Sequence, residues 1–498
     1  MPSETAVPPV RTYGMFIDGQ SQQTPELFRR EDPGTRELIA EFSRGAHVHV
    51  DAAIAAARRE FDHGTWPALS GQHRAAVLLR LAELMRRDQE KLAQIEAEES
   101  GKPIRLARGD VAASVGLTEY AAALALTVHG EVHTNLGPDF TGLVMREPVG
   151  VVAMITPWNF PLLLLMQKLP FALAAGCTTI CKPAELTAGT TLEIAALAQE
   201  AGLPDGVFNV VTGPGSVIGD RLAQSDDVDF LSFTGSTTVG QSIVKASAGS
   251  LKRLSMELGG KAASIVFPDA DMEDAVDGVL FAVLFNQGEC CVSGSRLLVH
   301  EQIADEFVAA LTDRIRTLRI GVPHDEESDI GPLIHEEHLT EVLGYVEGAK
   351  ASGASVVVGG ERLAGGSFDN GFFMAPTIID RVDPGSALFQ EEVFGPVLAV
   401  ARFSSEDEAV ELANAVDFGL ANTIWSKNID TALSVSRRLR SGTVWVNTTI
   451  DGAPQLPGGG VKKSGYGREM GLAGFEEFTE VKTIQIRTGK RKPFFRTS

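Results

Sequence analysis

Hydrophobic positions near the start of the chain recur at helical spacing. Helices are predicted over residues 51–61 and 70–99, and Gly101-Lys-Pro103 ends the second one. The apolar residues of the second helix fall on one face, at spacings of three and four: Val77, Leu78, Leu81, Leu84 and Met85. This part of the chain is therefore expected to pack amphipathic helices against a core.

From residue 149 onward, short apolar runs alternate with helical segments. The apolar runs predict strands at 149–155, 177–182, 207–211, 228–233 and 251–257. The helices predicted between them are 161–176, 187–202, a short helix capped by Ser216 and another capped by Ser236. The strands are apolar throughout, which indicates burial on both faces. The expected fold class is α/β with a parallel, doubly wound sheet.

A second strand–helix series begins after residue 261. Its predicted elements are a strand at 262–267, a helix capped by Asp271 that runs to about residue 286, and strands at 297–300, 355–358 and 397–403. The glycine-rich segment 363–371 is predicted to be a surface loop. A second α/β domain is therefore expected.

Two segments interrupt this alternation. Residues 130–146 have the pattern of a polar hairpin, and residues 480–488 that of a terminal strand. Open strand edges need pairing partners, and pairing with another subunit is one solution.

The length and charge of the chain limit its organisation and its partners. At 498 residues, two or three domains are expected, because a single hydrophobic core does not extend over so long a chain. The net charge is −21. An acidic surface repels phosphate backbones and anionic lipids, which argues against nucleic-acid and membrane partners.

Cysteine usage indicates a reducing, cytoplasmic location. Four cysteines are too few for a disulfide framework. Cys177 and Cys181 lie in an apolar run without a His/Cys cluster, so buried thiols are favoured over a metal pair and no metal is predicted. No secretory signal is predicted in the first ten residues, and prolines interrupt the uncharged run 149–167, which argues against a membrane span.

The adjacent thiols of Cys290 and Cys291 are the first candidates for chemistry. They lie in the loop Asn286-Gln-Gly-Glu-Cys-Cys-Val-Ser-Gly-Ser-Arg296, whose N–H groups can stabilise a thiolate and later an oxyanion. The alternative is a buried pair that fills the core. Glu257 ends an apolar strand before two glycines, where it can act as a general base; alone, an ion pair with Lys261 is favoured.

A rigid loop carries the third candidate. In Thr156-Pro-Trp-Asn-Phe-Pro161 the prolines hold Asn159, whose amide can donate to an oxyanion. The alternative is that Asn159 caps the helix that Pro161 begins.

Two strand ends have the pattern of a dinucleotide site. Gly235 and Ser236 follow a strand and open a helix, where backbone N–H groups can hold a phosphate. Lys182 and Glu185 follow another strand and can bind ribose hydroxyls, and the carboxylate would repel a 2′-phosphate, which favours NAD over NADP. The alternatives are a surface ion pair and ordinary turns.

Three further segments are weaker signals. Residues 213–219 come near a G-x-G-x-x-G pattern, and a loop is favoured there. Residues 391–396 and the glycine-rich stretch 457–469 can line a pocket, although surface turns explain both.

Together these motifs resemble the aldehyde dehydrogenase superfamily from about Val10 to Ile486. The motifs occur in the family's order: Pro-Trp-Asn-Phe-Pro, Lys-Pro-Ala-Glu, Phe-Thr-Gly-Ser-Thr, Glu-Leu-Gly-Gly-Lys, the cysteine loop closed by Ser-Arg, Glu-Glu-Val-Phe-Gly-Pro and Ser-Gly-Tyr-Gly-Arg-Glu. In that family the nucleophile lies five residues before the arginine of the Ser-Arg pair, which selects Cys291 over Cys290.

The resemblance implies roles for individual residues. Cys291 is the implied nucleophile, Glu257 the general base, Asn159 the oxyanion donor and Glu469 a candidate proton relay. The implied cofactor contacts run from the adenosine ribose through the pyrophosphate to the nicotinamide ribose: Lys182, Glu185, Gly235, Ser236, Glu392, Phe394 and Trp158. The implied reaction oxidises an aldehyde to its carboxylic acid with NAD⁺, through a cysteine thiohemiacetal and thioester.

The resemblance also implies a division into parts. The expected parts are a Rossmann-like dinucleotide-binding domain (1–128 and 147–257), an α/β catalytic domain (258–450), a β oligomerisation arm (129–146 and 478–498) and a return segment near the active site (451–477). A homo-oligomer, either dimer or tetramer, is expected. A cysteine-dependent ester hydrolase or acyltransferase and an inactive structural relative are the alternative functions.

Three positions depart from the family pattern. Glu289 stands where Gln is common, and an extra acid near Cys291 opposes thiolate formation unless its side chain points away. Gly458 replaces a frequent Phe, which implies a wider or differently shaped pocket. Thr238 replaces a frequent Glu, with little expected effect.

Overall fold

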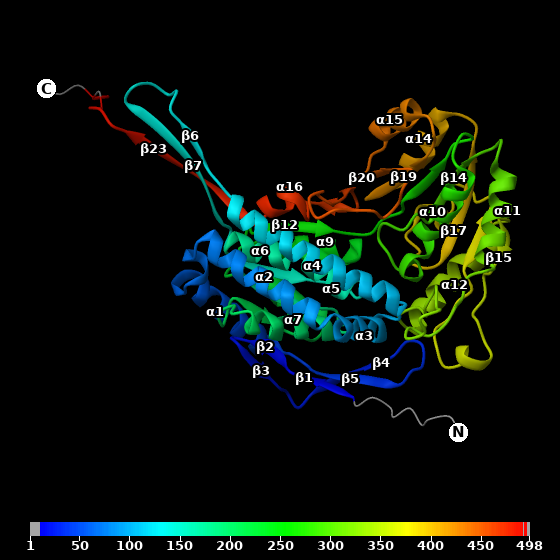
Figure 1. The fold of residues 1–498 in the computed structure, drawn as a ribbon, viewed down its shortest axis with the longest axis horizontal. Coiled ribbons are helices and arrows are strands. Elements are labelled where there is room, and N and C mark those ends of the chain that lie inside the picture. The colour runs from blue at the N-terminus through cyan, green and yellow to red at the C-terminus, as the bar shows by residue number, and fades with distance from the viewer. Residues whose placement is uncertain (1–9, 492, 496–498) are drawn as a thin grey trace.

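The computed structural model describes residues 10–491 and 493–495. The predicted absence of a secretory signal concerns the chain start, and residues 1–9 lie outside the described residues, as do 492 and 496–498 in the predicted arm. Figure 1 shows a body with two sheets and an arm that projects from it.

The larger sheet is mostly parallel, as predicted. Its order is β22-β12-β11-β8-β9-β10-β2-β3, in which β12 to β10 run parallel and the outer strands antiparallel. Its strands are β2 (Met15–Ile17), β3 (Gln20–Gln22), β8 (Val151–Ile155), β9 (Thr178–Lys182), β10 (Phe208–Val210), β11 (Phe230–Thr234), β12 (Arg253–Glu257) and β22 (Gly465–Tyr466). All residues of β8, β9 and β11 are buried, which explains their unbroken apolar pattern.

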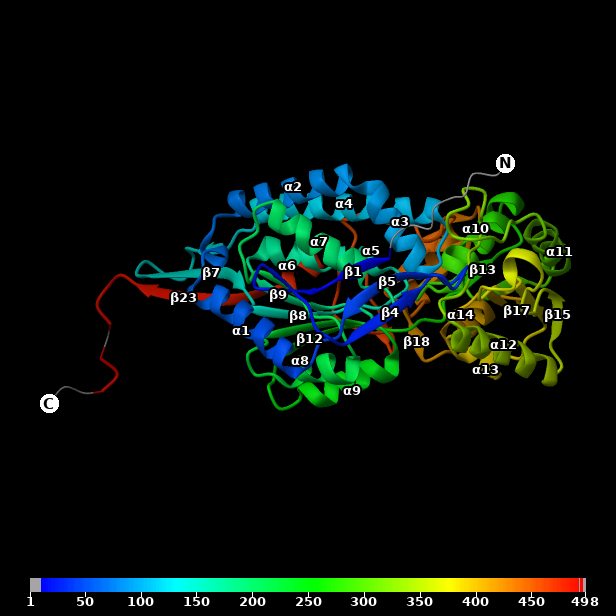
Figure 2. The same ribbon diagram turned by 90° about the horizontal axis from the view of Figure 1, so that it is seen from below.

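Helices cover both faces of this sheet, which makes it doubly wound (Figure 2). One face carries α1 (His47–His63), α8 (Asp220–Gln224) and α9 (Thr237–Ser247). The other carries α2 (Gly71–Arg87), α3 (Gln89–Ser100), α4 (Ile104–Thr127), α5 (Pro161–Met166), α6 (Leu169–Ala175) and α7 (Gly189–Glu200).

Several predicted helices differ in detail. The predicted helix 70–99 is two helices, because Asp88 (φ −101°, ψ 17°) leaves the helical conformation. The predicted helix 161–176 also divides, since Pro170 in the first turn of α6 cannot continue the hydrogen bonding of α5. Ser216 caps nothing: it lies inside a π-helical turn, Gly215–Gly219, that begins after Pro214.

Helix α4 was not predicted. It packs on α2, α3 and α6, and its exposed stripe is largely alanine, glycine and leucine (Gly109, Ala112, Ala113, Ala123 and Leu126), so the sequence shows little contrast between polar and apolar faces.

The second sheet has the order β15-β16-β17-β14-β13-β19-β20, with only β15 antiparallel to its neighbour. Its strands are β13 (Ala263–Val266), β14 (Arg296–His300), β15 (Ser355–Val358), β16 (Thr377–Asp380), β17 (Val397–Phe403), β19 (Ala421–Trp425) and β20 (Thr443–Val446). Its helices are α10 (Met272–Leu284), α11 (Ala304–Ile315), α12 (Glu336–Ala351), α13 (Ala387–Gln390), α14 (Glu406–Asn414) and α15 (Ile429–Arg438). Asp271 caps α10 as predicted.

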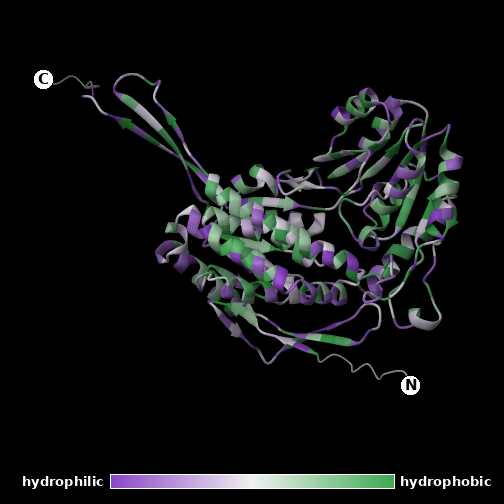
Figure 3. Cartoon of the chain, viewed as in Figure 1, coloured by the Kyte–Doolittle hydropathy of each residue, from purple (hydrophilic) through white to green (hydrophobic). Residues whose placement is uncertain are grey.

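Each sheet has apolar clusters of its own on both faces. Figure 3 shows the apolar strands enclosed by helices that carry both polar and apolar residues. The smaller elements are β1 (Arg11–Tyr13), β4 (Leu27–Glu31), β5 (Leu38–Ser43), β18 (Phe418–Gly419), β21 (Val461–Lys462) and α16 (Gly471–Glu476). Among the described helices, none combines the length and hydrophobicity that a bilayer crossing requires.

The arm is a three-stranded antiparallel sheet. It consists of β6 (Glu131–His133), β7 (Phe140–Pro148) and β23 (Thr479–Arg487), in the order β23-β7-β6. The predicted hairpin and terminal strand thus pair with each other over the whole length of β7. The outer edges of β6 and β23 carry no further strand in the described chain.

Candidate active site

The predicted site residues gather where the parallel strands of the larger sheet end. The backbone N–H of Thr156, after β8, donates to the carbonyl of Lys182 at the end of β9, over 3.1 Å. The N–H of Gly235, after β11, donates to the carbonyl of Glu257 at the end of β12, over 3.0 Å. Ligands of open α/β sheets bind at this carboxyl edge.

The cysteine loop reaches this edge from the second sheet. After α10 the chain turns through three consecutive left-handed residues, Asn286 (φ 52°), Gln287 (φ 57°) and Gly288 (φ 77°). A Cβ atom at Gly288 would lie 2.3 Å from the carbonyl of Gly395, so only glycine permits this approach. The turn thereby sets the cysteines beside the segment that carries Glu392 and Phe394.

The loop after Glu257 touches the cysteine loop directly. A Cβ atom at Gly260 would lie 2.1 Å from the carbonyl oxygen of Cys291. The N–H of the same glycine donates to Oε1 of Glu392 over 2.9 Å. Gly260 therefore brings three predicted site residues, Glu257, Cys291 and Glu392, to one place.

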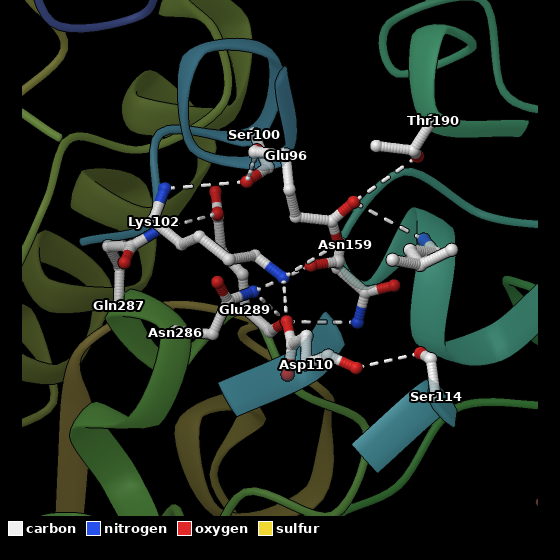
Figure 4. Close-up of polar contacts among 11 residues, drawn as sticks. Glu96, Ser100, Lys102, Asp110, Ser114, Asn159, Thr190, Asn286, Gln287 and Glu289 are labelled. Carbon is white, nitrogen blue, oxygen red and sulfur yellow. Dashed lines mark hydrogen bonds and ion pairs between the residues drawn. The ribbon is translucent and has the colours of Figure 1, made fainter. Parts of the chain in front are cut away.

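Asn159 lies against the cysteine loop, beside Asn286 and Glu289 (Figure 4). Its Nδ2 donates to the backbone carbonyl of Glu289 over 3.0 Å, and the Asn159 residue is 3% exposed. Nδ2 of Asn286 donates to the backbone carbonyls of both Asn159 and Glu289. A side-chain amide has two protons, so the second N–H of Asn159 is left for a ligand. The alternative role as a helix cap is wrong, because Phe160 occupies the N-cap position of α5 and no side chain caps that helix.

The electrostatics of the site favour neutral forms of both reactive groups. A hydrogen bond with the Cys290 thiol, burial, and the carboxylates of Glu392 and Glu257 raise the pKa of Cys291 well above its ordinary value. Burial and the Glu469 carboxylate raise the pKa of Glu257. Thiolate formation at Cys291 thus needs a group that accepts its proton.

Glu257 is held without a partner cation. Its Oε1 is buried, has no hydrogen-bond partner among the described residues, and lies 2.9 Å from the Cβ position of Gly459. Lys261, the ion-pair partner of the alternative interpretation, is itself buried with an unpartnered Nζ within that same part of the chain. The expected surface ion pair is therefore wrong.

A buried ion pair between Lys168 and Glu469 lies near Glu257. The sequence analysis singled out Glu469 but not Lys168. Lys168 contacts the carboxylate of Glu469, and its Nζ donates to Oγ1 of Thr234 over 2.7 Å. The available signal was one lysine in the apolar run that forms α5 and α6, because a charge there must be buried and paired.

The predicted cofactor residues line the same edge. Ser236 caps α9 by accepting from the N–H of Val239, and other N–H groups of that first turn have no partner within the helix. A Cβ at Gly235 would lie 2.6 Å from the Phe233 ring, so a side chain there would displace that ring. Burial lowers the pKa of Lys182. Nη1 of Arg44, a residue the sequence reasoning missed, lies 3.9 Å from Oε1 of Glu185.

At the other end of this edge, aromatic rings pack together. The ring of Trp158 meets that of Phe394 edge-on at 5.3 Å between centroids, and that of His338 at 5.7 Å. His338 is a further residue that no sequence motif indicated.

The weaker sequence signals have structural explanations. The segment 213–219 is a loop followed by the π-helical turn, and Cys177 and Cys181 are buried free thiols. Within the described residues no cluster of metal ligands occurs. The Glu289 side chain points away from Cys291, because its Oε1 accepts from the N–H of Ile334 over 2.9 Å.

The sequence profile described as the Aldehyde dehydrogenase family matches residues 19–484. The chain belongs to the aldehyde dehydrogenase family. It is 45% identical over 476 residues to betaine aldehyde dehydrogenase of Bacillus subtilis, covering 95% of this chain and 97% of that protein. It is 42% identical to the NADP/NAD-dependent aldehyde dehydrogenase PuuC of Escherichia coli, covering 95% of each chain.

Solved structures of aldehyde dehydrogenases have the same fold. A NAD-dependent aldehyde dehydrogenase from Sinorhizobium meliloti superposes with a TM-score of 0.96 at 44% identity, over 98% of this chain and 97% of the other. Betaine aldehyde dehydrogenase from Staphylococcus aureus, in complex with NAD⁺, gives 0.95 at 37% identity over 97% of each chain. The predicted family and fold class are confirmed, and this chain is an oxidoreductase of the aldehyde dehydrogenase family.

Proposed function

We propose that this aldehyde dehydrogenase oxidises its substrate with NAD⁺ through a covalent intermediate on Cys291. The observation that carries the proposal is the contact of Gly260 with the Cys291 carbonyl, which brings a carboxylate, a thiol and an amide donor to one strand edge. The relatives crystallised with NAD⁺ support the cofactor.

The chain's own residues supply the covalent chemistry. The Cys291 sulfur bonds to the carbonyl carbon of the aldehyde, and its proton passes to solvent water, so this step does not require Glu257. The free N–H of Asn159 and the Cys291 backbone N–H hold the oxyanion of the thiohemiacetal. NAD⁺, when bound, accepts the hydride whose departure leaves a thioester.

Glu257 activates water for hydrolysis of that thioester. Burial and the Glu469 carboxylate raise its pKa, which makes the ionised carboxylate a stronger base toward water. Glu469 and Lys168 form the proton relay behind it. The acid product leaves, and Cys291 regains its proton.

The residues at the sheet edge fit a dinucleotide. Lys182 and Glu185 would hold the adenosine ribose, and the α9 N-terminus with Gly235 and Ser236 the pyrophosphate. Glu392, Phe394 and Trp158 would hold the nicotinamide ribose. Glu185 favours NAD⁺ over NADP⁺, because its carboxylate repels a 2′-phosphate.

The aldehyde is proposed to lie against an apolar wall at the cysteine loop. Phe160, Leu164 and Cys290 form one cluster, and Phe285 stacks on Phe160 at 5.5 Å. The ring centroid of Phe281 lies 5.1 Å from that of Phe285. The net charge of −21 favours encounter with cationic or neutral aldehydes over anionic ones.

The remaining expectations extend the proposal. We propose the same division into parts as the sequence predicts. The dinucleotide-binding domain is 1–128 with 147–257, and the catalytic domain is 258–450. The oligomerisation arm is 129–146 with 478–498, and the return segment is 451–477. The arm exposes Val132, Val481 and Ile484 beside unpaired strand edges, so we propose that it joins copies of the chain into a homodimer or homotetramer in the cytoplasm.

One assay tests the function. Reduced nicotinamide should accumulate with betaine aldehyde or neutral aliphatic aldehydes and NAD⁺, and more slowly with an aldehyde that carries a carboxylate. Cys291→Ala should abolish turnover and keep NAD⁺ binding. Ester hydrolysis with no NAD⁺-dependent turnover of any aldehyde would reject the proposal in favour of a cysteine hydrolase.

A further inference from the structure

Glu289 is a fully buried carboxyl group between the nucleophile loop and α12. Its residue exposure is 0%, and Oε1 accepts from the N–H of Ile334 over 2.9 Å. Nε2 of Gln287 is the other side-chain contact, at 3.4 Å from Oε2. Nε2 of His338 lies 3.7 Å from Oε1, too far for a hydrogen bond. The side chain therefore joins the loop to the segment just before α12.

The backbone of Glu289 serves the other side of the site. Its carbonyl accepts from the amide of Asn159 over 3.0 Å, and its N–H donates to the carbonyl of Asn286 over 2.9 Å (Figure 4). A shift of this residue would displace the proposed oxyanion donor together with the loop that carries Cys291.

The contacts continue from α12 to the proposed nicotinamide end. Nε2 of His338 lies 2.7 Å from the carbonyl of Phe394, and it must donate because a carbonyl only accepts. Phe394 has φ 58°, an unfavourable conformation for an aromatic residue that needs support from its surroundings. The hydrogen bond from His338 supplies that support.

The contacts close into a ring. Trp158 packs edge-on against both Phe394 and His338, and its neighbour Asn159 returns to Glu289. The proposed oxyanion donor Asn159 and the proposed nicotinamide contact Phe394 are thus linked by one set of contacts. Glu289 contacts Asn159 through its backbone carbonyl and the segment before α12 through its side chain.

We propose that Glu289 is a positioning residue. Through Ile334 and His338, it holds the turn at Phe394 in a fixed position relative to Asn159 and Cys291. This inference rests on the proposed function, because Phe394 is assigned to the cofactor there. It gives a role to the position where Glu replaces the family's common Gln: a buried acceptor for the Ile334 N–H, which Gln can also provide.

The test is a double-mutant cycle read by NAD⁺ binding, with calorimetry giving Kd and steady-state kinetics giving KM. Glu289→Ala and His338→Ala should each raise Kd and KM for NAD⁺ about tenfold, as loss of a buried hydrogen bond does. KM for the aldehyde should change far less. The double variant should be no worse than Glu289→Ala alone, because both changes release the same turn.

Two variants serve as controls. Glu289→Gln keeps an acceptor for Ile334 and should restore NAD⁺ affinity to within about twofold of the unmodified protein. Asp380→Asn alters another buried carboxylate, one at the end of β16 that accepts from the N–H of Arg381 over 2.7 Å, and should leave both constants unchanged. It measures the effect of converting a buried carboxyl group to an amide as such.

The outcomes separate this inference from the function on which it rests. An unmodified protein that binds no NAD⁺ would refute the proposed function. Normal NAD⁺ affinity in His338→Ala, or effects of the two single changes that multiply in the double variant, would refute the positioning role alone. If Glu289→Ala does not fold, Glu289→Gln and His338→Ala still decide the matter.

Discussion

The side-chain amide of Asn159 is tied to the backbone carbonyl of Glu289, two residues before Cys291, by a hydrogen bond of 3.0 Å. The bond orients the amide so that its second N–H can meet an oxyanion formed at the neighbouring sulfur. The proposed oxyanion donor and the proposed nucleophile are therefore positioned by the same loop.

Removal of this donor should slow catalysis. Asn159→Ala is expected to lower kcat roughly 10²–10³-fold, as loss of one oxyanion donor does. Asn159→Asp keeps the shape but has no N–H, so it should fail in the same way. Steady-state rates and NAD⁺ affinity measure the effect; a rate within about threefold of the unmodified protein in Asn159→Ala would contradict the assignment.

A methyl group at Gly260 should disrupt the site. The Cβ of Gly260→Ala would lie 2.1 Å from the Cys291 carbonyl oxygen, so one of the two loops must move. We expect at least about a hundredfold loss of kcat/KM, since small displacements of reacting groups have large effects. Gly249→Ala is the matched control, because its Cβ meets nothing within 4 Å. Equal activities of the two variants would show that the loops do not meet as described.

The sequence predicted the strand ends and the cysteine loop better than it predicted the helices around them. Strand ends, glycine turns and the cysteine loop each have a local signature, because the chemistry requires particular residues there. Helix α4 has none, since its exposed stripe consists largely of alanine, glycine and leucine rather than polar residues. Ser216 has the composition of a cap, but the chain forms a π-helical turn around it.

Sequence patterns could not predict the contacts that support the site residues. Lys168 and Glu469 are far apart in the chain and meet only through tertiary packing. The same holds for His338 and Phe394. Glu289 was expected to hinder thiolate formation by proximity in sequence, and only the direction of its side chain removes that expectation.

Cofactor choice should depend on a pair of side chains at the adenosine end. Glu185→Ala removes the carboxylate that would repel a 2′-phosphate and leaves Arg44 and Lys182 to attract one. NADP⁺ should then bind roughly tenfold tighter, and Arg44→Ala in the same protein should cancel much of the gain. Titration with both cofactors measures this; an unchanged preference in Glu185→Ala would place the discrimination elsewhere.

Stability should respond to pH through Glu289. Burial raises the pKa of this carboxyl well above its ordinary value, with Arg30 and Lys102 as the nearby cations and His338 facing it. The folded protein then retains a proton that the unfolded chain releases, so this residue's contribution to stability falls as pH rises. Glu289→Gln has no proton to lose. The Tm of Glu289→Gln minus the Tm of the unmodified protein should therefore increase from about pH 5 to about pH 8. A Tm difference that does not change with pH would mean that Glu289 is ionised in the folded state.

The most direct test is to trap the acyl group. In Glu257→Gln, water activation should be slow while acylation continues, so rapid quenching during aldehyde oxidation followed by mass spectrometry should find one acyl group per subunit on Cys291. Glu469→Gln should accumulate less, because it impairs only the relay. Acyl groups on Cys290, or none on either cysteine while NADH is formed, would contradict covalent catalysis at Cys291.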